Sequence, residues 1–505
     1  MARLHEYQGK AILKAAGIRV PEGAPAGSSE EAGRIAQDLG GPVVVKMQAW
    51  TTHRASMGGI RFADTPADAE AAAKEMLGRK VGAFTVEKVL VERRIDIAQE
   101  FFASIVVDDA ASRPVLLFSA AGGTGIEERA RSGEGGVVQQ PIDVVNGLAD
   151  YDARNLVRKL GLSGTAQRDV AAALVSLVKT AVNKDARTAE INPLVITKEG
   201  KVLAADCRLT IDDYAVIRHP EMGIAIAREL DHPPTELELI AQKVEDADFR
   251  GTFYFAQLAT GFNREDKFVG FHGAGGGGSM MSMDAITDAG FKLANFTDTS
   301  GNPSAAKVYR AAIIIMHQPN IVGYFGSGSG VASQEQYHSA YGLAKAFHEM
   351  QLNIPAVIRL GGNSEKRAIQ ILTDYSKGLP APVECYGKDD TPAFCAKRFK
   401  DLVDKQGTTA APLKWNRPAP AAEVYTFPIT GGRVYLDHAR CDEATNAILL
   451  EYGQGIFKVE NGKPVLAMTE AEVAGKNSEL IACEVECRGR ANDALYVELP
   501  IERLS

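Results

Sequence analysis

Two oxygen-bearing side chains and a neighbouring carboxylate near the middle of the chain are suited to magnesium and phosphate chemistry. The run Glu190-Ile191-Asn192-Pro193-Leu194 is followed by a strand-like stretch, Lys201 to Ala205, that ends on Asp206. Mg²⁺ prefers one or two protein oxygens and leaves its other positions to phosphates and water. Asn192 and Asp206 on neighbouring strands, with Glu190 beside them, therefore predict a magnesium-nucleotide site. The alternative is that Asn192-Pro193 is a turn and Asp206 a solvated strand end.

The elements that would bring phosphate to this site lie in the first 130 residues. Lys46 closes the apolar run Pro42 to Val45 and precedes a loop of basic and small residues, His53 to Gly59. A lysine at the end of a buried strand, followed by such a loop, can place an ammonium and backbone N–H groups on polyphosphate. Two further predicted strands, Val89 to Glu92 and Pro114 to Phe118, complete the pattern.

These segments together resemble the ATP-grasp domain of the β subunit of succinyl-CoA synthetase and of the wider NDP-forming acyl-CoA synthetases. The resemblance runs in unbroken order from residue 1 to about 400. The segments that carry it are Leu4-His5-Glu6-Tyr7-Gln8-Gly9-Lys10, Glu92 to Glu100, Glu190 to Leu194, Ile211 to Ala215 and Arg218 to Glu221.

The resemblance implies a role for each matching residue of the nucleotide site. The nucleotide-binding residues would be Lys46, Arg54 and Ala55 at the phosphates, Glu92 and the backbone near Ile95 at the adenosine, and Glu100 at the ribose or phosphates. Asn192 and Asp206 would bind Mg²⁺. Glu190 would be the catalytic carboxylate that orients a phosphohistidine. The phosphate loop, Thr52 to Ser56, retains Arg54 but lacks the paired glycines usual in the family.

A second domain is predicted after the polar helix near Pro234 to Asp248. Strand signals at Phe268 to Phe271, Ile321 to Phe325 and Ala356 to Leu360 are separated by helical stretches. This alternation predicts βαβ units and a parallel sheet, and it matches the flavodoxin-like ligase domain of the same family.

A glycine-rich turn follows the middle strand of this domain. Gly326-Ser327-Gly328-Ser329-Gly330 precedes a predicted helix, so backbone N–H groups and the helix N-terminus would stabilise an anion. The alternative is a flexible turn that only reverses the chain. In the relatives this helix points at the phosphohistidine loop of the partner, which implies that role for Ser329, Gly330 and Val331.

The carboxylic acid substrate is not fixed by these residues. The turn lacks the arginine-bearing sequence of succinate-using members, and His272 stands where those members usually carry an asparagine. Succinate is therefore disfavoured, and the turn is somewhat closer to citrate-activating relatives such as ATP-citrate lyase. His272 would contact the substrate or the phosphohistidine loop, or would be a hydrogen-bonded structural histidine.

The last segment resembles a bacterial ferredoxin module without its complete ligand set. In a C-x₂-C-x₂-C-x₃-C run that ends at Cys487, the other positions are Cys483, Leu480 and Asn477, and the other half of the module keeps only Cys441. Leucine cannot ligate iron, so no iron–sulfur cluster is expected. We interpret the module as a retained scaffold or docking surface.

The expected architecture is α/β and α+β, in about three domains. An ATP-grasp domain spans residues 1–240, a flavodoxin-like ligase domain 241–406, a Thr-, Ala- and Pro-rich linker 407–422 and a degenerate ferredoxin-like domain 423–505. The net charge of −8 disfavours a nucleic-acid partner. With no apolar run of about 18 residues and no signal-like start, neither membrane spanning nor secretion is supported, and a cytoplasmic location is expected.

The function implied is that of the β subunit of a carboxylate–CoA ligase. Its substrates would be ATP or GTP, CoA and a small carboxylic acid, with Mg²⁺. Its partner in a hetero-oligomer would be an α subunit that carries the CoA-binding domain and the phosphorylated histidine. The alternatives are a subunit of a citrate-activating enzyme and a non-catalytic regulatory subunit. An iron–sulfur electron-transfer protein is disfavoured by the missing cysteines.

Overall fold

The computed structural model describes residues 2–50, 54, 56–120, 136–226, 232–248, 250–328, 332, 334–407, 410–418 and 424–504. The chain divides into two compact units, Met1–Pro234 and Thr235–Ser505. Among the described residues, no helix combines the length and the apolar character that crossing a membrane would need.

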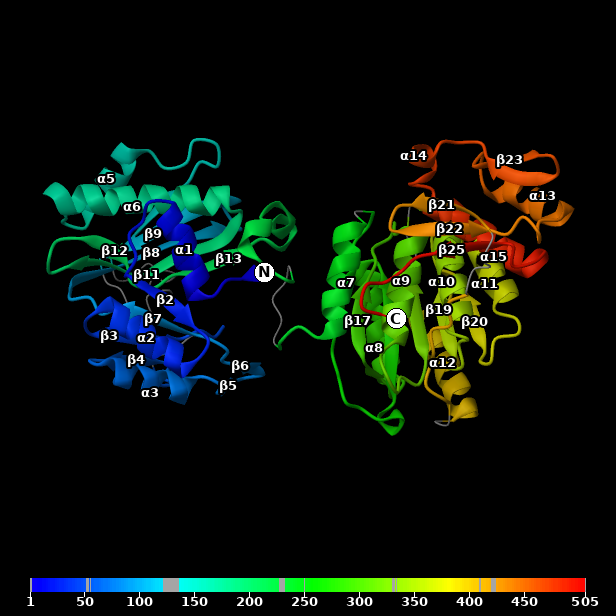
Figure 1. Cartoon of the computed structure of the whole chain (residues 1–505), viewed down its shortest axis with the longest axis horizontal. Coiled ribbons are helices and arrows are strands. Elements are labelled where there is room, and N and C mark those ends of the chain that lie inside the picture. The colour runs from blue at the N-terminus through cyan, green and yellow to red at the C-terminus, as the bar shows by residue number, and fades with distance from the viewer. Residues whose placement is uncertain are drawn as a thin grey trace. The chain divides into compact units, whose positions relative to one another are not determined.

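The larger sheet of the first unit is antiparallel, and it carries the middle-chain motif (Figure 1). Its order is β1-β13-β11-β8-β9-β10, with β12 paired beside β11. The strands are β1 (Ala2–Arg3), β8 (Ile97–Asp108), β9 (Arg113–Ser119), β10 (Val137–Pro141), β11 (Ala186–Thr197), β12 (Val202–Ala204) and β13 (Arg208–Ile211). Helices α1 (Glu6–Ala15), α5 (Asp150–Lys159) and α6 (Gly164–Asn183) accompany it. Val170, Leu174 and Leu177 of α6 recur at helical spacing and are buried in the core beneath β11.

A smaller antiparallel sheet supplies the other side of the first unit. Its order is β2-β7-β3-β4, formed by β2 (Gly23–Ala26), β7 (Val89–Arg93), β3 (Val43–Met47) and β4 (Ile60–Ala63). Helices α2 (Ser29–Leu39) and α3 (Pro66–Met76) are N-capped by Ser28 and Thr65, whose hydroxyls accept backbone N–H groups. The other short elements are β5 (Lys80–Val81), β6 (Phe84–Thr85) and two 3₁₀ helices, Asp213–Arg218 and Pro220–Met222.

The second unit contains the predicted parallel sheet, which is confirmed. Its order is β14-β17-β15-β18-β19-β20, with β16 beside β15, and only the β14–β17 pair is antiparallel among the pairs described. The strands are β14 (Tyr254–Gln257), β15 (Phe268–Ala274), β16 (Lys292–Leu293), β17 (Asn295–Asp298), β18 (Tyr324–Gly328), β19 (Ala356–Arg359) and β20 (Val383–Tyr386).

Helices cover both faces of the parallel sheet, as βαβ connections require. The helices α8 (Gly276–Asp288) and α12 (Pro392–Gln406) share one apolar core with the sheet. The other core is formed with α7 (Glu236–Ala247), α9 (Ala305–Met316), α10 (Tyr337–Glu349) and α11 (Glu365–Tyr375). A short 3₁₀ helix spans Arg264–Asp266.

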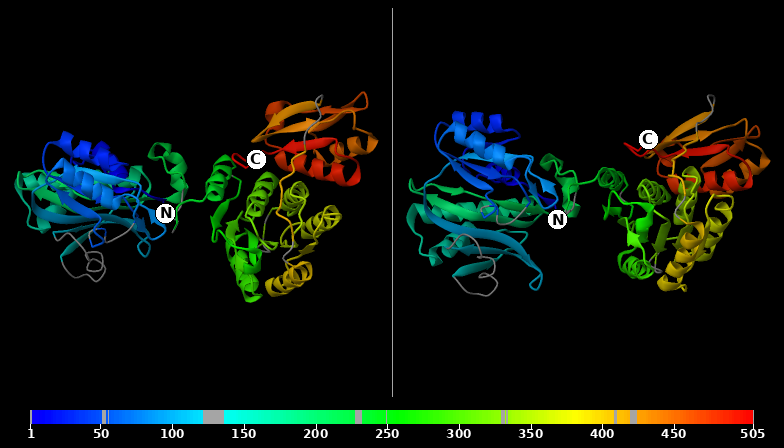
Figure 2. Two further views of the ribbon diagram at one scale, coloured as in Figure 1. Left: turned by 60° about the horizontal axis from the view of Figure 1, so that its bottom comes forward. Right: turned by 90° about the horizontal axis from the view of Figure 1, so that it is seen from below.

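A small C-terminal module, defined here as residues 424–504, packs on the second core (Figure 2). Its strands are β21 (Tyr425–Ile429), β22 (Gly432–Leu436) and β25 (Leu495–Glu498), with the hairpin β23 (Phe457–Glu460) and β24 (Lys463–Leu466). Its helices are α13 (Glu443–Tyr452), α14 (Glu470–Val473) and α15 (Asn477–Arg490). Helix α15 lies against α9, α10 and α11, so the module and the parallel-sheet domain bury a common interface.

Candidate active site

Strand β11 presents Glu190 and Asn192 on the same face of the larger sheet. Side chains alternate along a strand, and here Ala189 and Ile191 are buried whereas Glu190 and Asn192 are partly exposed. The Asn192–Pro193 peptide is cis, and the β11–β8 register shifts between Ile191 and Leu194. Glu190 and Asn192 therefore lie next to an interruption in the regular hydrogen bonding between β11 and β8. Such irregularities in a sheet often change the direction of functional side chains.

Asp206 is brought opposite Asn192 by the pairing of β11 with β12. Leu194 pairs with Ala204, and the Ala205 N–H donates to the Pro193 carbonyl over 3.0 Å. Continuing this antiparallel register by one more step sets Asn192 facing Asp206. Within the described ranges no group of three or more His, Cys, Asp or Glu side chains gathers as a metal site. One amide oxygen and one carboxylate suit Mg²⁺, which fills its remaining positions with water and phosphate oxygens.

Lys46 and Arg54, two of the predicted phosphate ligands, belong with Asp206 to one ion-paired cluster. Arg54 Nη2 lies 2.8 Å from Asp206 Oδ2, and Arg54 Nη1 lies 2.7 Å from Glu6 Oε2. Lys46 Nζ lies 2.9 Å from Glu6 Oε1 and also 2.9 Å from Glu92 Oε2. The Lys46 ammonium additionally donates to the Ala205 carbonyl over 2.7 Å. Residues 46, 54 and 206, which are far apart in the sequence, are thereby assembled around one point.

Glu6 and Lys10 of α1 complete the cluster, and sequence reasoning gave them no role. Lys10 Nζ lies 2.8 Å from Glu6 Oε1 and 2.6 Å from Glu92 Oε1. The buried face of α1 contains Glu6, Gly9, Lys10 and Leu13, a helical spacing on which two charged residues are unusual. That spacing is the signal that could have identified them.

The charges of the cluster control one another's protonation. Burial alone would raise the pKa of Glu6, but Lys46, Lys10 and Arg54 outweigh burial and hold that pKa well below its usual range. Burial, together with the Glu6 charge, raises the pKa of Asp206 despite the nearby cations. The carboxylates raise the pKa of Lys46 against its burial, so the lysine stays charged. Three cations face three carboxylates, so the formal charges of the cluster balance.

The remaining predicted nucleotide residues lie near this cluster or along β8. Glu92 is buried on β7, and its carboxylate is held by the two lysine ammonium groups rather than exposed to a base. Ile95 is half-buried in the turn between β7 and β8, and Glu100 is exposed on β8. Ala55 lies outside the described residues.

The predicted glycine-rich turn is wrong for Gly326, Ser327 and Gly328, which continue strand β18 because they pair with its neighbouring strands. Ser329, Gly330 and Val331 lie outside the described residues. The strand that leads to them, β18, is held at its end by Arg359, whose Nη1 donates to the Gly328 carbonyl over 3.0 Å. The same guanidinium donates to the Asp390 and Lys388 carbonyls over 2.6 and 2.9 Å. Arg359 therefore ties two loops together at the carboxyl edge of the parallel sheet.

His272 is buried on β15, and both of its ring nitrogens have partners. Nδ1 lies 2.5 Å from the Tyr324 hydroxyl and Nε2 lies 3.1 Å from the Thr299 hydroxyl. Burial lowers the pKa of His272 to about 4. The ring is therefore neutral at physiological pH. Because both ring nitrogens have partners, the contacts favour a structural role for His272.

The depressed pKa of His272 predicts a pH-dependent contribution to stability. An unfolded histidine titrates near pH 6.5, so between pH 6.5 and about 4 the unfolded chain binds a proton that the folded chain does not. This contribution is complete above pH 6.5 and is lost as the pH falls towards 4, by about 3 kcal/mol. Urea unfolding of wild type and of His272→Gln at pH 7.0 and 4.5 measures it. We expect a shallower loss in the variant, and equal losses in the two proteins would contradict the assignment.

Two of the three cysteines of the C-terminal module lie on one helix in the core of the module, and the third, Cys441, packs against that core. Cys483 and Cys487 belong to α15 and are buried, as is Leu480 one turn earlier. Burial raises the pKa of the Cys487 thiol to about 12 and that of Cys441 to about 11. These thiols are therefore neutral side chains that fill the core between α13 and α15.

Comparison with known proteins assigns a domain family to part of each unit. The ATP-grasp domain family matches residues 3–196, and the citrate-binding domain family of ATP citrate lyase matches residues 260–396. The β subunit of the GDP-forming succinate–CoA ligase of Thermus thermophilus is 36% identical over 370 residues, 73% of this chain and 93% of that protein. The β subunit of the ADP-forming succinate–CoA ligase of Rubrobacter xylanophilus is 33% identical over 409 residues, 80% of this chain and 99% of that protein.

Among solved structures, ATP citrate lyase from Methanothrix soehngenii, in complex with citrate and coenzyme A, superimposes with a TM-score of 0.65. It is 20% identical in sequence, and the match covers 80% of this chain and 99% of that chain. At that identity the likeness concerns the fold. The predicted combination of an ATP-grasp domain and a parallel-sheet domain is confirmed.

Proposed function

We propose that this chain, which belongs to the family of succinate–CoA ligase β subunits, is the nucleotide-binding subunit of a carboxylate–CoA ligase. The observation that supports it most directly is the ion pair of Arg54 with Asp206, which Glu6 joins to Lys46, while strand register brings Asn192 opposite Asp206. A non-catalytic subunit would have no need to keep this set of residues together.

Lys46 and Arg54 would bind the nucleotide phosphates. In the resting cluster their charges are balanced by Glu6, Glu92 and Asp206, and Lys10 remains as a separate partner for the two glutamates. When phosphate oxygens take up Lys46 and Arg54, Lys10 can keep Glu6 and Glu92 paired in the interior. The cost of leaving a buried carboxylate without a counter-ion is thereby avoided.

Asn192 and Asp206 would hold Mg²⁺. The ion, when bound, supplies charge that neutralises the transferring phosphoryl group. Arg54 fixes the Asp206 carboxylate on one side, and the Cys207 N–H donates to Asp206 Oδ1 over 2.7 Å on the other. The carboxylate is therefore oriented before any ligand arrives, which is the preorganisation that electrostatic catalysis needs.

The second reactant at this site would be a histidine of a partner α subunit. In the proposed relay, the nucleotide passes its terminal phosphate to that histidine, and the phosphate then moves to the carboxylic acid. Attack by the CoA thiol on the acyl phosphate releases inorganic phosphate and leaves the thioester. Glu190 lies on the same face as Asn192 and would orient the histidine by accepting the N–H of the ring nitrogen that is not phosphorylated. We place this hetero-oligomer in the cytoplasm.

Glu190→Gln separates the orienting role from nucleotide binding. The amide retains the size of the side chain but loses the charge that favours a histidine N–H, so we expect phosphorylation of the partner to slow by about 10²-fold. The affinity for the magnesium nucleotide should stay within about two-fold, because Glu190 is not assigned to metal or phosphate. Equilibrium binding and single-turnover phosphorylation measure the two effects. An equal loss of both would make Glu190 a nucleotide or metal ligand instead.

The acid substrate has two candidates. Succinate is named for the relatives, whereas the match of residues 260–396 to the citrate-binding domain of ATP citrate lyase favours citrate. We propose an acid other than succinate, because the turn at 329–335 has no arginine to clamp a small diacid. Losing such a clamp costs roughly 1.5–3 kcal/mol, or about 10- to 100-fold in kcat/KM.

Measuring kcat/KM for succinate, malate, citrate and aromatic acids with the reconstituted complex decides between them. We expect citrate or another larger acid to exceed succinate by about 10-fold or more. Succinate as the best substrate would refute the proposal on the acid and leave the role of the nucleotide site untouched.

A further inference from the structure

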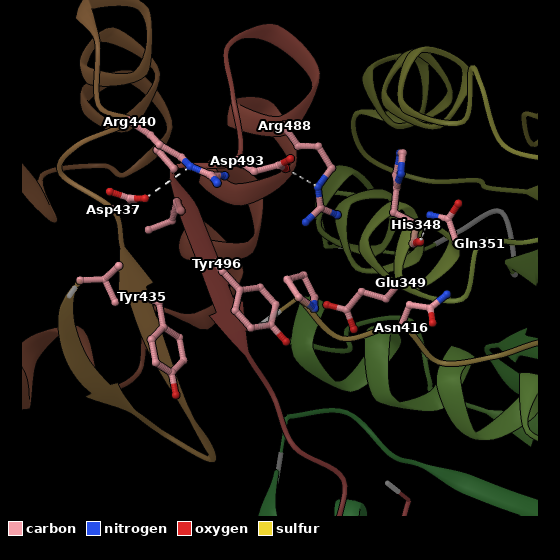
Figure 3. A pocket seen from close by; sticks show the side chains of 14 residues that line it. His348, Glu349, Gln351, Asn416, Tyr435, Asp437, Arg440, Arg488, Asp493 and Tyr496 are labelled. Atoms are coloured by element: carbon pink, nitrogen blue, oxygen red, sulfur yellow. Dashed lines mark hydrogen bonds and ion pairs between the residues drawn. The ribbon is translucent and has the colours of Figure 1, made fainter. Parts of the chain in front are cut away.

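A cavity of about 700 Å³ lies where the C-terminal module meets the end of α10 (Figure 3). The rings of Tyr435 on β22 and Tyr496 on β25 form part of its wall, and His348 and Glu349 of α10 lie across from them. The family matches end at residue 396, so His348, Glu349 and Gln351 belong to a matched domain, whereas the rest of the cavity lining lies beyond both matches. Its volume falls within the range of small-molecule sites.

Several hydrogen-bond donors of the cavity lining are left open. Arg488 uses Nε on Asp493 at 2.9 Å and Nη2 on Glu484 at 3.2 Å, while its Nη1 has no partner in the described part of the chain. The Arg440 side chain contacts Asp437 through Nε over 3.4 Å. Neither of its Nη atoms has a hydrogen-bond partner among the described residues. The Tyr496 hydroxyl also lacks a bonded acceptor within the described ranges.

The acceptors of the cavity are partly occupied. His348 Nε2 lies 2.5 Å from the Tyr375 carbonyl and must donate to it, which leaves Nδ1 with a lone pair. The pKa of His348 is lowered by burial, so this ring adds no positive charge. The Asp493 carboxylate is 61% exposed and covers one edge of the Arg488 guanidinium. The oxyanion of a ligand could therefore replace the Asp493 carboxylate at the Arg488 guanidinium.

The walls of the cavity are fixed by a buried ion network, so the donors are held in place. Lys345 Nζ lies 2.7 Å from Glu349 Oε1 and 2.8 Å from Glu484 Oε2, and all three side chains are almost fully buried. Glu484 also accepts the Val497 N–H of β25 over 3.1 Å. Helix α10, helix α15 and strand β25 therefore form one rigid frame around Arg488 and Tyr496.

We propose that this cavity binds a small organic molecule through a phosphate or carboxylate group. Arg440 and Arg488 would donate to the oxyanion, displacing Asp493 towards solvent, and the Tyr496 hydroxyl would donate a further hydrogen bond. The planar guanidinium fork suits both kinds of oxyanion. The rest of the ligand would lie against Tyr435 and Tyr496, whose rings stack at 6.0 Å. This site is separate from the proposed nucleotide site and does not depend on it.

Trp415 provides a local signal for binding in the full-length chain. Its Nε1 donates to Glu349 Oε2 over 2.8 Å, and Glu349 lines the cavity. The chain has two tryptophans, so Trp50→Phe leaves Trp415 as the sole reporter. The probes are citrate for the carboxylate class and inorganic pyrophosphate for the phosphate class, each titrated without nucleotide and followed by Trp415 emission.

We expect at least one probe to give a saturable change, and the stronger probe identifies the oxyanion class. In the same background, Arg440→Gln should raise Kd at least 10-fold, and Arg433→Gln, an exposed arginine on the same module outside the cavity, should leave Kd unchanged. Asp493→Asn should lower Kd several-fold because it removes the competing carboxylate. The proposal is overturned if neither probe gives a saturable change up to about 10 mM. It is equally overturned if Arg440→Gln and Arg433→Gln give the same Kd.

Discussion

Replacing Asp206 with alanine is expected to lower nucleotide-dependent turnover of the assembled ligase by on the order of 10³-fold or more. The variant removes the only charged ligand of the proposed Mg²⁺ site, and a metal ion contributes several kcal/mol of charge stabilisation in phosphoryl transfer. The fold should survive, because Arg54 keeps its 2.7 Å ion pair with Glu6 when Asp206 is lost.

Steady-state turnover of the complex together with circular dichroism of the variant tests this expectation. Glu199→Gln is the matched control, because Glu199 is an exposed carboxylate in the turn between β11 and β12, paired only with Lys201 in the structure described. The control should retain full turnover. Turnover of Asp206→Ala close to that of wild type would contradict the metal assignment.

Replacing Lys345 with methionine is expected to lower the free energy of unfolding by about 3–5 kcal/mol. The ammonium is fully buried and is paired with Glu349 and Glu484, so its removal leaves two carboxylates in the interior with one less counter-ion. Glu349 also accepts the Tyr309 hydroxyl and the Trp415 N–H, but these neutral donors do not replace the charge of the ammonium.

Urea denaturation measures the loss, with Lys377→Met as the control. Lys377 is 71% exposed and paired with Asp374 at 2.7 Å, and breaking a surface pair of that kind should cost less than about 1 kcal/mol. Limited proteolysis of Lys345→Met should also cleave between residues 407 and 424 more rapidly, because the network joins the C-terminal module to α10. A loss no greater than that of the control would mean that the network does not stabilise this interface.

Local patterns were sufficient to predict the elements but not the contacts between them. The alternation of apolar strands and helical stretches after residue 240 predicted a parallel sheet, and β15, β18 and β19 form it. The apolar run before Lys46 predicted a strand, and β3 spans Val43–Met47. These signals depend on side-chain periodicity, which is a property of a short segment.

The cluster around Asp206 could not be derived in full because its ion pairs join residues far apart in the sequence. Arg54 and Asp206 are separated by 152 positions, and Lys10 and Glu92 by 82. Glu6 and Lys10 have the spacing of an ordinary surface pair on a helix, yet both are buried and paired with residues distant in the sequence. Their roles follow from packing that sequence spacing does not encode.

The burial of helix α10 is a second feature that the sequence alone did not predict. The large apolar side chains Tyr337, Tyr341 and Phe347 recur at helical spacing along one stripe, but nearly the whole helix is buried. The face that includes Lys345 is covered by α15 of the C-terminal module. A charged residue on a helix is ordinarily solvated, so its burial becomes evident only when the covering element is in place.

The central claim is that this chain, with magnesium nucleotide, phosphorylates a histidine of its partner subunit. The most direct test is to incubate the reconstituted complex with Mg²⁺ and ATP or GTP labelled in the terminal phosphate, without CoA or acid, and to follow the label on each subunit. We predict alkali-stable, acid-labile label on the α subunit, discharged by CoA plus the acid and absent with Asp206→Ala. No label on the α subunit, or equal labelling with wild type and Asp206→Ala, would contradict the claim.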